Sequence, residues 1–452
     1  MNVIKLSRAR LLLCLLSMGS LCAQESADRS IALDALTQGA KLWQLTPEQA
    51  EGQFGRQAHL QWLSKDAREH AMIKRQPYSN VRQELKIAGD KLEVEEVTLD
   101  FASGKLAKLA FSLWNRGDSR ESLDEKAFKK RIVDTTAALD GVFGVKATDQ
   151  GVDRTSAVKF SRMQWMSDSL AAQLEYSGSK VQGGGWQAEF IRLRIVPPLK
   201  RAAVGAGPAT IGGNAMNVSR ADLVKNVQTD AATGEVTIVG VPMVDQGMKG
   251  YCAVASCQRI FNYYGMNVDE HEMAQVAETG AAGGTSSAKL MQSLDQLEGK
   301  LKVHFKKVYD LMNNKEMSAM VSDYNRISRK HGASPLEWYN ADLGEMNPDD
   351  LRDARSRGAD YNKFQKSVKQ SIDKGVPLLW SLHLGLYPEN GEPALQNGGG
   401  HMRIIIGYNF KDPAKPTLIF TDSWGAGHEK KVIAMADAFA ATTGLISVEP
   451  QK

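Results

Sequence analysis

The first part of the chain shows mostly alternating apolar and polar positions, which is the period of a half-buried strand. Such stretches between residues 24 and 198 are KLEVEEVTLDF, KLAKLAFSLW, AVKFSRMQWM, LAAQLEYSG and WQAEFIRLRIV. DEKAFKKRIVDTTAALDGVFG has helical spacing and ends at a glycine, and Thr46 followed by Pro47 predicts the start of another helix. We therefore expect residues 24–198 to form an α+β domain with an antiparallel sheet.

The second part, residues 221–452, shows helical patterns first and strand patterns afterwards. After an initial strand, EVTIVGVPMV, helices are expected over YCAVASCQRIFNYYG, VDEHEMAQVAE, SSAKLMQSLDQLEG, KEMSAMVSDYNRISRKHG and YNKFQKSVKQSIDKG. Strands are expected over VPLLWSLHL, HMRIIIGYNF, PTLIFTDSW and KKVIAMA. This order predicts a second α+β domain, in which N-terminal helices pack on an antiparallel sheet. Residues 199–220 are rich in Gly and Ala, which indicates a linker between the two domains.

The first 23 residues have the three parts of an export signal. A basic start with Lys5, Arg8 and Arg10 precedes the apolar stretch LLLCLLSMG, and a small residue, Ala23, stands before the expected cut. An uncleaved anchor or a buried first helix is the alternative. Cleavage removes three positive charges, so the net charge falls from +4 to +1. We expect an exported protein, periplasmic or secreted, that is not held at a membrane once the signal is removed.

Composition and charge exclude several classes of protein. Hydrophobic content of 42% and charged content of 24% are ordinary for a globular protein. The mature chain has no basic stripe interleaved with aromatic residues, so nucleic acid is not an expected partner. No cluster of His and Cys has the spacing of metal ligands, and neither a metal nor a cofactor is expected. The sequence does not indicate an oligomeric state.

The use of cysteine points to chemistry rather than to a disulfide framework. Cys14 and Cys22 leave with the signal, so the mature chain keeps Cys252 and Cys257. If both lie on one helix, five positions correspond to about 140° of rotation, so the two thiols point apart. A disulfide between them is not expected, and we expect at least one thiol to have a chemical role.

Cys252 has the features of a nucleophile. It follows Gly250 and Tyr251 and precedes an apolar helical pattern, which places the thiol in the first turn of a helix. There the helix dipole and the open backbone N–H groups stabilise a thiolate and lower the pKa of the thiol. A nucleophilic thiolate also needs a base and donors for an oxyanion. Gln246, six residues upstream, is a candidate donor together with the backbone N–H of Cys252; a solvated loop glutamine is the alternative.

The candidate base is His401, which heads a strongly apolar strand after three glycines. Glycines allow a backbone to come close to a partner, although an ordinary histidine at the start of a strand remains the alternative. The other histidines are expected in different surroundings. His59 and His70 belong to the first domain, and His271, His304 and His331 are expected on the surface. His383 is expected in the core and His428 in a turn.

Asp422 is the candidate acid that orients the imidazole. It ends the apolar strand TLIFTD, the next strand after that of His401, so the two strands are expected to lie side by side. A carboxylate there would stabilise the cationic ring, and Trp424 could shield the pair from water. An aspartate that caps a turn at a strand end is the alternative. The order of a cysteine with its histidine far downstream is typical of papain-type nucleophiles.

Three stretches carry a resemblance to a known family: VPMVDQGMKGYCAVASCQRIFNYYG, GGGHMRIIIGYNF and FTDSWG. Over about residues 238–448 the chain resembles the papain-like cysteine peptidases, and among them the bacterial peptidases related to the bacteriocin (double-glycine) leader-processing family. The resemblance implies that Cys252 is the nucleophile, His401 the base, Asp422 the orienting acid and Gln246 the oxyanion donor, with a peptide or protein as substrate. Two departures are CAVAS where the family often has CGPA, and a longer helical insertion at about 300–375.

The hypothesis from the sequence is therefore an exported cysteine peptidase. Cell-wall peptide amidases and acyl-transferases use the same thiol chemistry and form the first alternative; a catalytically dead peptidase fold that acts as a binding protein is the second. The N-terminal domain is expected to be an inhibitory pro-segment or a recruitment module. Gly212 and Gly213 allow self-processing, with a flexible linker as the favoured interpretation. Cys257 is expected to be a buried packing residue.

Overall fold

The computed structural model describes residues 29–55, 60–64, 67–74, 83–117, 121–153, 158–180, 185–198, 219–246, 251–266, 268, 270–277, 287–295, 298–392 and 398–451. The expected signal peptide and His59 lie outside these ranges, as does nearly all of the expected linker. Within the described ranges, no helix combines the length and the apolar character needed to cross a membrane.

A large antiparallel sheet dominates the N-terminal part. Its order is β2-β3-β6-β7-β11-β10-β9-β8, in which the strands are β2 (Leu60–Trp62), β3 (His70–Lys74), β6 (Glu96–Ala102), β7 (Lys105–Asn115), β11 (Trp186–Val196), β10 (Ala171–Lys180), β9 (Phe160–Met166) and β8 (Thr148–Asp153). A smaller sheet joins β1 (Arg29–Ala32), β4 (Gln83–Ile87) and β5 (Leu92–Val94), with β1 parallel to β4.

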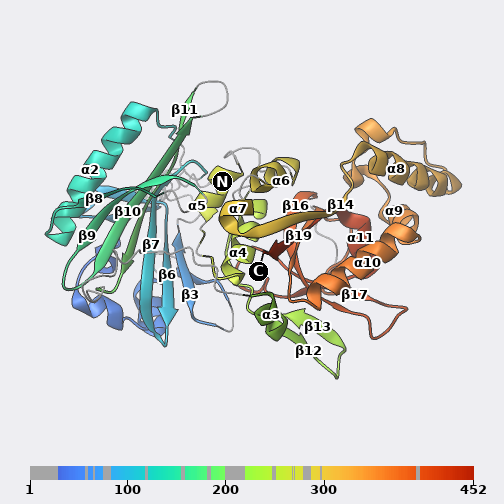
Figure 1. Cartoon of the computed structure of the whole chain (residues 1–452), viewed down its shortest axis with the longest axis horizontal. Helices are drawn as coiled ribbons and strands as arrows, with labels where there is room; N and C mark the ends of the chain where they lie inside the picture. Colours follow the sequence, from blue (N-terminus) through green and yellow to red (C-terminus); the bar gives the residue numbers. More distant parts are fainter. Residues whose placement is uncertain are drawn as a thin grey trace, which may run out of the picture.

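Two α-helices accompany these sheets and follow their capping signals. Thr46 and Gln49 form a capping box at the start of α1 (Pro47–Phe54), and Pro47 is its first residue. Asp124 caps α2 (Glu125–Phe143), which ends at Gly144 in the left-handed conformation with φ of 67°. Figure 1 shows α2 lying along the side of the large sheet that faces away from the C-terminal part.

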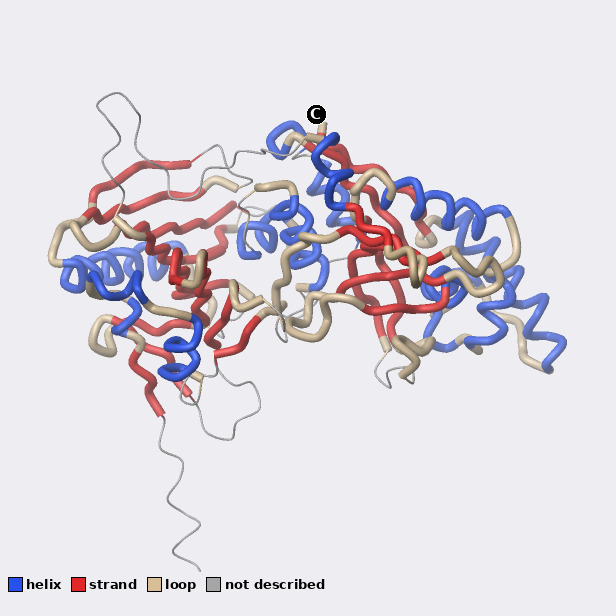
Figure 2. Tube along the Cα trace, turned by 90° about the horizontal axis from the view of Figure 1, so that it is seen from below, coloured by secondary structure: helices blue, strands red, loops and turns tan. Residues whose placement is uncertain are grey.

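The C-terminal part is built on a second antiparallel sheet. Its order is β12-β13-β16-β15-β19-β14, and β17 and β18 continue from β16; the strands are β12 (Val227–Thr229), β13 (Glu235–Ile238), β16 (Gly399–Asn409), β15 (Leu378–Leu384), β19 (Thr442–Pro450), β14 (Val303–Asp310), β17 (Thr417–Thr421) and β18 (Lys431–Ala434). Figure 2 shows the strands of the two large sheets as separate groups with helices between and around them.

The helices of the C-terminal part come before and between its strands. They are α3 (Arg220–Leu223), α4 (Cys252–Tyr263), α5 (Glu270–Val276), α6 (Ser287–Asp295), α7 (Glu298–Leu301), α8 (Asn314–Ser328), α9 (Pro348–Arg355), α10 (Ala359–Ile372) and α11 (Met435–Ala441). Short 3₁₀ helices lie in both parts of the chain. Those of the N-terminal part are Asp34–Leu36 and Ala40–Gln44, and those of the C-terminal part are Val224–Asn226, Arg329–His331, Trp338–Asn340 and Leu343–Glu345. In Figure 1, α4 and α5 lie between the two large sheets.

Each part has a large apolar core of its own. One core is made of buried side chains between residues 33 and 195, and the other of buried side chains between residues 223 and 448. In α4, Val254, Cys257, Ile260 and Phe261 carry the helical apolar spacing into the second core, and Tyr264 continues it at the C-cap. The separation of the chain into domains 24–198 and 221–452 stays a prediction.

The coarse class predicted from the sequence is confirmed: the protein is mixed α and β with mostly antiparallel sheets. The order expected for the second part, helices and then strands, is correct for most elements and wrong at β14. β14 lies inside the stretch that was expected to be a helical insertion and pairs with β19 at the end of the chain. Alternation in VHFKKVYD is interrupted at Lys306 and Lys307, next to the point where the register of β14 against β19 shifts between Lys307 and Tyr309.

Two further boundaries differ from the expectation. The strand expected over KKVIAMA ends at Ala434, and Met435 begins α11 instead. The strand expected over EVTIVGVPMV ends at Ile238, and residues 239–244 form no regular element. In the first case the apolar run continues because α11 packs in the core, which does not require a strand. In the second case Val239 is exposed, and Met243 packs with Leu63 and Met72 apart from the two large cores.

Candidate active site

Cys252 occupies the first position of α4, as its sequence context predicts. Tyr251 is the N-cap residue and is buried, with 2% of its surface exposed. The thiol of Cys252 is partly buried and hydrogen-bonded to His401. Burial opposes a charged thiolate, but the hydrogen bond and the charge of His401, with nearby backbone N–H groups, lower the pKa of Cys252 below that of an ordinary thiol. The arrangement favours a thiolate.

Cys257 lies on the same helix but away from the site. It is buried among apolar side chains, and both cysteines are free thiols. Burial, followed by the neighbouring charge of Cys252, raises the pKa of Cys257 far above its usual range. A neutral, buried Cys257 is the packing residue that the sequence predicts.

His401 lies on β16 between the thiol and a carboxylate. Its Nε2 is 2.8 Å from Oδ1 of Asp422, so Nδ1 is the ring nitrogen left for Cys252. Burial alone favours the neutral ring, but the hydrogen bonds to Asp422 and Cys252 and their negative charges raise the pKa of His401 to about 9. The ring is therefore an imidazolium at neutral pH, paired with the thiolate.

Asp422 follows the last residue of β17, and pairing between strands brings it to His401. β16 and β17 are antiparallel neighbours, with Ile404 opposite Thr421. The side chain of Asp422 has no exposed surface. Burial favours the neutral acid, but hydrogen bonding to His401 and the charge of Arg403 hold the pKa of Asp422 well below its usual range. A buried carboxylate of this kind stays ionised and orients the ring.

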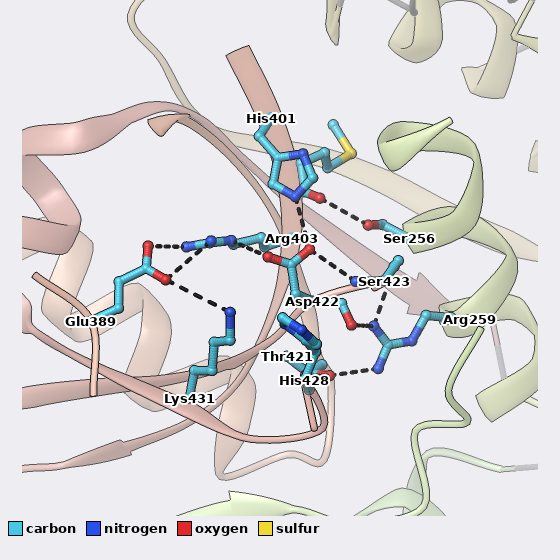
Figure 3. Close-up of polar contacts among 11 residues, drawn as sticks. Ser256, Arg259, Glu389, His401, Arg403, Thr421, Asp422, Ser423, His428 and Lys431 are labelled. Atoms are coloured by element: carbon cyan, nitrogen blue, oxygen red, sulfur yellow. Dashed lines mark hydrogen bonds and ion pairs between the residues drawn. The ribbon is translucent and has the colours of Figure 1, made fainter. Parts of the chain in front are cut away.

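A buried cation supports Asp422 from the side opposite His401. Arg403, also fully buried, donates from Nε to Oδ2 of Asp422 at 2.7 Å. Its terminal nitrogens donate to both carboxylate oxygens of Glu389, at 2.6 Å and 3.2 Å. Lys431 Nζ lies 4.0 Å from Glu389. Figure 3 shows Asp422 between His401 and Arg403, with Glu389 and Lys431 beyond the guanidinium.

A second buried arginine joins the nucleophile helix to the loop of Asp422. Arg259 lies seven residues after Cys252, so both side chains leave α4 on nearly the same face. Its guanidinium donates to the backbone oxygen of Asp422 at 2.8 Å, to Ser423 Oγ at 3.3 Å and to Thr421 Oγ1 at 2.6 Å. These bonds, visible on the right of Figure 3, fix the distance between the helix of Cys252 and the end of β17.

Gln246 lies beside the same loop. Its backbone N–H donates to the oxygen of Ser423 at 2.9 Å, and its neighbour Asp245 forms an isolated β-bridge with Trp424. The side chain is buried, with 6% exposed, and among the described residues its Oε1 has no hydrogen-bond partner. The unsatisfied atom is an acceptor, so the group of this side chain that could donate to an oxyanion is its Nε2 amide.

Trp424 covers the imidazole. Its ring stacks on His401 with centroids 4.9 Å apart and planes inclined by 29°. Arg403 and Lys431 lie over the same indole, at 5.7 Å and 5.1 Å from its centroid. The indole thus limits access of water to the imidazole and the groups behind it, as expected from the sequence.

The structure places His401 next to both Cys252 and Asp422, and it places Gln246 next to Ser423, the neighbour of Asp422. The expected place of one other histidine was wrong. His271 was expected on the surface and is buried, with 6% exposed, because α5 packs against the N-terminal sheet; its Nε2 is 3.8 Å from Glu96. His304 and His331 are exposed as expected, with 59% and 65% of their side chains accessible. His304 belongs to β14 and not to a helix.

The two buried arginines were not predicted from the sequence. Both interrupt strongly apolar patterns, HMRIIIGYNF and YCAVASCQRIFNYYG, and a charged residue inside such a pattern must be paired when it is buried. That signal could have marked Arg403 and Arg259 as partners of the site. Within the described ranges, no three or more His, Cys, Asp or Glu side chains are grouped so that they could hold a metal ion.

Comparison with known families agrees with the geometry. Residues 238–444 match the family model described as the Peptidase_C39 like family, a range that contains α4, β16 and the end of β17. No curated protein matches the chain. The resemblance expected from the sequence is thereby confirmed: the C-terminal part of this chain resembles the papain-like cysteine peptidases, and among them the Peptidase_C39 like family.

Proposed function

We propose that the protein is an exported cysteine peptidase in which Cys252 attacks a peptide carbonyl, His401 transfers protons, Asp422 orients the imidazole and Gln246 donates to the oxyanion. The observation that carries the proposal is the continuous hydrogen-bonded series from Cys252 through His401 to Asp422. A thiolate at a helix start, next to an imidazolium, is a nucleophile that works at neutral pH.

The first half-reaction makes a thioester. The Cys252 sulfur forms a bond to the carbonyl carbon, and the carbonyl oxygen becomes an oxyanion near the Gln246 amide and the Cys252 backbone N–H. The bond from carbon to nitrogen then breaks. His401 gives its proton to the departing amine, and Asp422 keeps the ring oriented.

The second half-reaction releases the acyl group. His401, now neutral, takes a proton from water while the water oxygen attacks the thioester carbon. The bond from carbon to sulfur breaks, a carboxylic acid leaves, and the thiolate and imidazolium are restored. Trp424 over the ring and the buried network behind Asp422 keep other water away from the imidazole.

Export through residues 1–23 belongs to the same proposal. Its support is the order of basic, apolar and small residues in that segment. N-terminal sequencing of the protein recovered from its producing cells tests it. A first residue of Gln24 supports cleavage, and an intact Met1 in all of the protein contradicts it.

The activity is tested by comparing wild type with Cys252→Ala on an unfolded protein substrate and on purified cell wall. Cys257→Ala is the matched control, because it removes the buried thiol of the same helix. Cleavage of protein by wild type and Cys257→Ala, and none by Cys252→Ala, is the expected result. Equal cleavage by wild type and Cys252→Ala would falsify the mechanism.

The same experiment separates the alternatives. Release of peptides from cell wall without cleavage of protein would replace the peptidase by an amidase or acyl-transferase that uses the same thiol. No activity on either material, together with slow alkylation of Cys252 by iodoacetamide, would indicate a catalytically dead binding protein.

A further inference from the structure

The segment that carries Gln246 and Cys252 is held at both ends by the N-terminal part of the chain. At one end Lys74 of β3 forms an ion pair with Asp245, the residue before Gln246. At the other end Gly117, just after β7, contacts Tyr251, the residue before Cys252. Lys74 and Gly117, which make these two contacts, lie outside residues 238–444, the range that matches the peptidase family.

The Lys74 contact is well placed to orient Gln246. Both side chains of the ion pair are mostly buried, with 20% of Lys74 and 14% of Asp245 exposed. Two residues earlier on the same face of β3, Met72 packs with Leu63 against Met243. Met72 and Lys74, which lie on one face of β3, therefore contact Met243 and Asp245 in the segment that leads to Gln246.

Packing alone holds this segment weakly. A cavity of about 340 Å³ lies between the N-terminal sheet and the segment Pro242–Val244, and Gln258 and Asn262 on the far face of α4 also line it. A segment beside a cavity lacks close contacts on that side and can shift at little cost. Its position then depends on directional contacts: the bonds from Arg259 to the Pro242 oxygen and from the Gln246 N–H to Ser423 within the C-terminal part, and the ion pair of Asp245 with Lys74.

The Gly117 contact is sterically tight. A Cβ placed on Gly117 would lie 1.8 Å from the hydroxyl oxygen of Tyr251, so any other residue there would displace the tyrosine. The Asn115 side chain accepts a hydrogen bond from the Gly117 N–H at 3.0 Å, which fixes this turn. Tyr251 is the N-cap of α4 and is buried, so a shift of its ring that reaches the backbone would change the position of the adjacent Cys252 N–H.

We propose that Lys74 and Gly117 are positioning residues for the oxyanion site, so that the N-terminal part completes the active site of the C-terminal part. This rests on the proposed function, because it assigns the Gln246 amide and the Cys252 N–H as oxyanion donors. It gives the N-terminal part a role distinct from an inhibitory pro-segment or a recruitment module: its docking aligns the two donors.

Two reactions of the same thiol test the proposal in the full mature chain. Iodoacetamide alkylates Cys252 by displacing iodide at a saturated carbon and forms no oxyanion. p-Nitrophenyl acetate acylates Cys252 through a tetrahedral oxyanion: a carbon–sulfur bond forms, the ester carbon–oxygen bond breaks, and p-nitrophenolate leaves. A residue that positions oxyanion donors affects the second reaction and not the first.

We expect Lys74→Met to slow acylation of Cys252 by about tenfold or more, which is part of the effect of losing one oxyanion donor outright. Alkylation should stay within about twofold of wild type. Reversal of the pair in the double variant Lys74→Asp, Asp245→Lys should restore much of the acylation rate. Lys86→Met is the matched control, because Lys86 pairs with Glu84 within the N-terminal part at similar exposures of 22% and 15%.

Gly117→Ala is the independent second variant, and we expect it also to slow acylation selectively. Equal rates of acylation in wild type, Lys74→Met and Gly117→Ala would overturn the inference. An equal loss of acylation and alkylation would also overturn it, since a general disturbance of the fold would then explain the effect. If wild type is alkylated but not acylated, the proposed function itself fails, and the inference fails with it.

Discussion

Arg403 donates from Nε to Oδ2 of Asp422 at 2.7 Å, while His401 bonds to the other carboxylate oxygen at 2.8 Å. His401 and Arg403 are two residues apart on β16, so both side chains leave the same face of the strand. One strand thus presents the imidazole and the cation that keeps its partner ionised. The carboxylate is fixed in angle as well as in charge, which a single contact with His401 would not achieve.

The first prediction concerns Arg403. Arg403→Met leaves Asp422 and Glu389 buried without their shared cation, so we expect a loss of about 3–5 kcal/mol in the free energy of unfolding at neutral pH. Urea denaturation measures it. Arg326→Met is the control, because its pair with Asp323 is 64% and 55% exposed and should contribute less than about 1 kcal/mol. An equal effect of the two substitutions would contradict the assigned role.

Arg403→Met should also change how the free energy of unfolding depends on pH in the acid range. A carboxyl whose pKa is depressed in the folded state stabilises the protein above its unfolded pKa, about 3.9, and this contribution is lost as pH falls through the folded pKa. The pKa of Asp422 is held low partly by Arg403, so removing Arg403 reduces that contribution and moves its loss to higher pH. Urea midpoints compared between about pH 3 and pH 7 measure the shift, and parallel curves for wild type and variant would refute it.

The second prediction concerns the pH dependence of Cys252 alkylation. The pKa of Cys252 is lowered and that of His401 is raised to about 9, so the thiolate and imidazolium coexist between these values. Rapid labelling by iodoacetamide should therefore begin below the ordinary thiol value of about 8.5. His401→Ala should move the midpoint upward, and peptide mapping locates the label. An unchanged midpoint in His401→Ala would show that the imidazole does not stabilise the thiolate.

The third prediction concerns the charge of Asp422. Asp422→Asn keeps the shape of the side chain but removes the negative charge that raises the pKa of His401. We expect acylation of Cys252 to fall by on the order of 10²-fold, with a lower apparent pKa for the imidazole. Stopped-flow release of p-nitrophenolate across pH measures both. A variant with the rate and pH profile of wild type would exclude an orienting role for the carboxylate.

The fourth prediction concerns the contact between the two parts of the chain. Arg192 of β11 forms buried ion pairs with Glu175 of β10 and Glu272 of α5, with about 2%, 1% and 3% of the side chains exposed. Arg192→Met should destabilise the protein by about 1.5–3 kcal/mol, because both buried carboxylates lose their shortest charged contacts but keep Arg194, at 3.4 Å from Glu175 and 3.7 Å from Glu272. Thermal and urea unfolding measure this.

A matched control for the interface is Arg68→Met. Arg68 pairs with Glu51 at 2.8 Å, but the side chains are 47% and 46% exposed, so its loss should have little effect. If Arg192→Met were as stable as Arg68→Met, the two parts would be held together by other contacts. If Arg192→Met also slows acylation more than alkylation, docking of the N-terminal part controls the oxyanion donors.

Much of the fold and the candidate site could be predicted from local sequence. The start of α4 at Cys252, the strand of His401 and the caps of α1 and α2 all lie where the pattern places them. Helix and strand periods and capping residues act over a few positions, so neighbours in sequence carry the information. Edge strand β14 was missed because its partner, β19, is more than a hundred residues away.

What the sequence by itself determined is the set of reactive groups and the elements that carry them: a thiol at a helix start, an imidazole on an apolar strand and a carboxylate at the end of the next one. Tertiary structure decided the rest. Pairing of β16 with β17 sets the distance from His401 to Asp422, burial forces Arg403 and Arg259 to find partners, and docking of β3 places Lys74 against Asp245. The hydrogen bonds and ion pairs among these contacts join residues from 19 to 171 positions apart, and no local period of the sequence encodes such contacts.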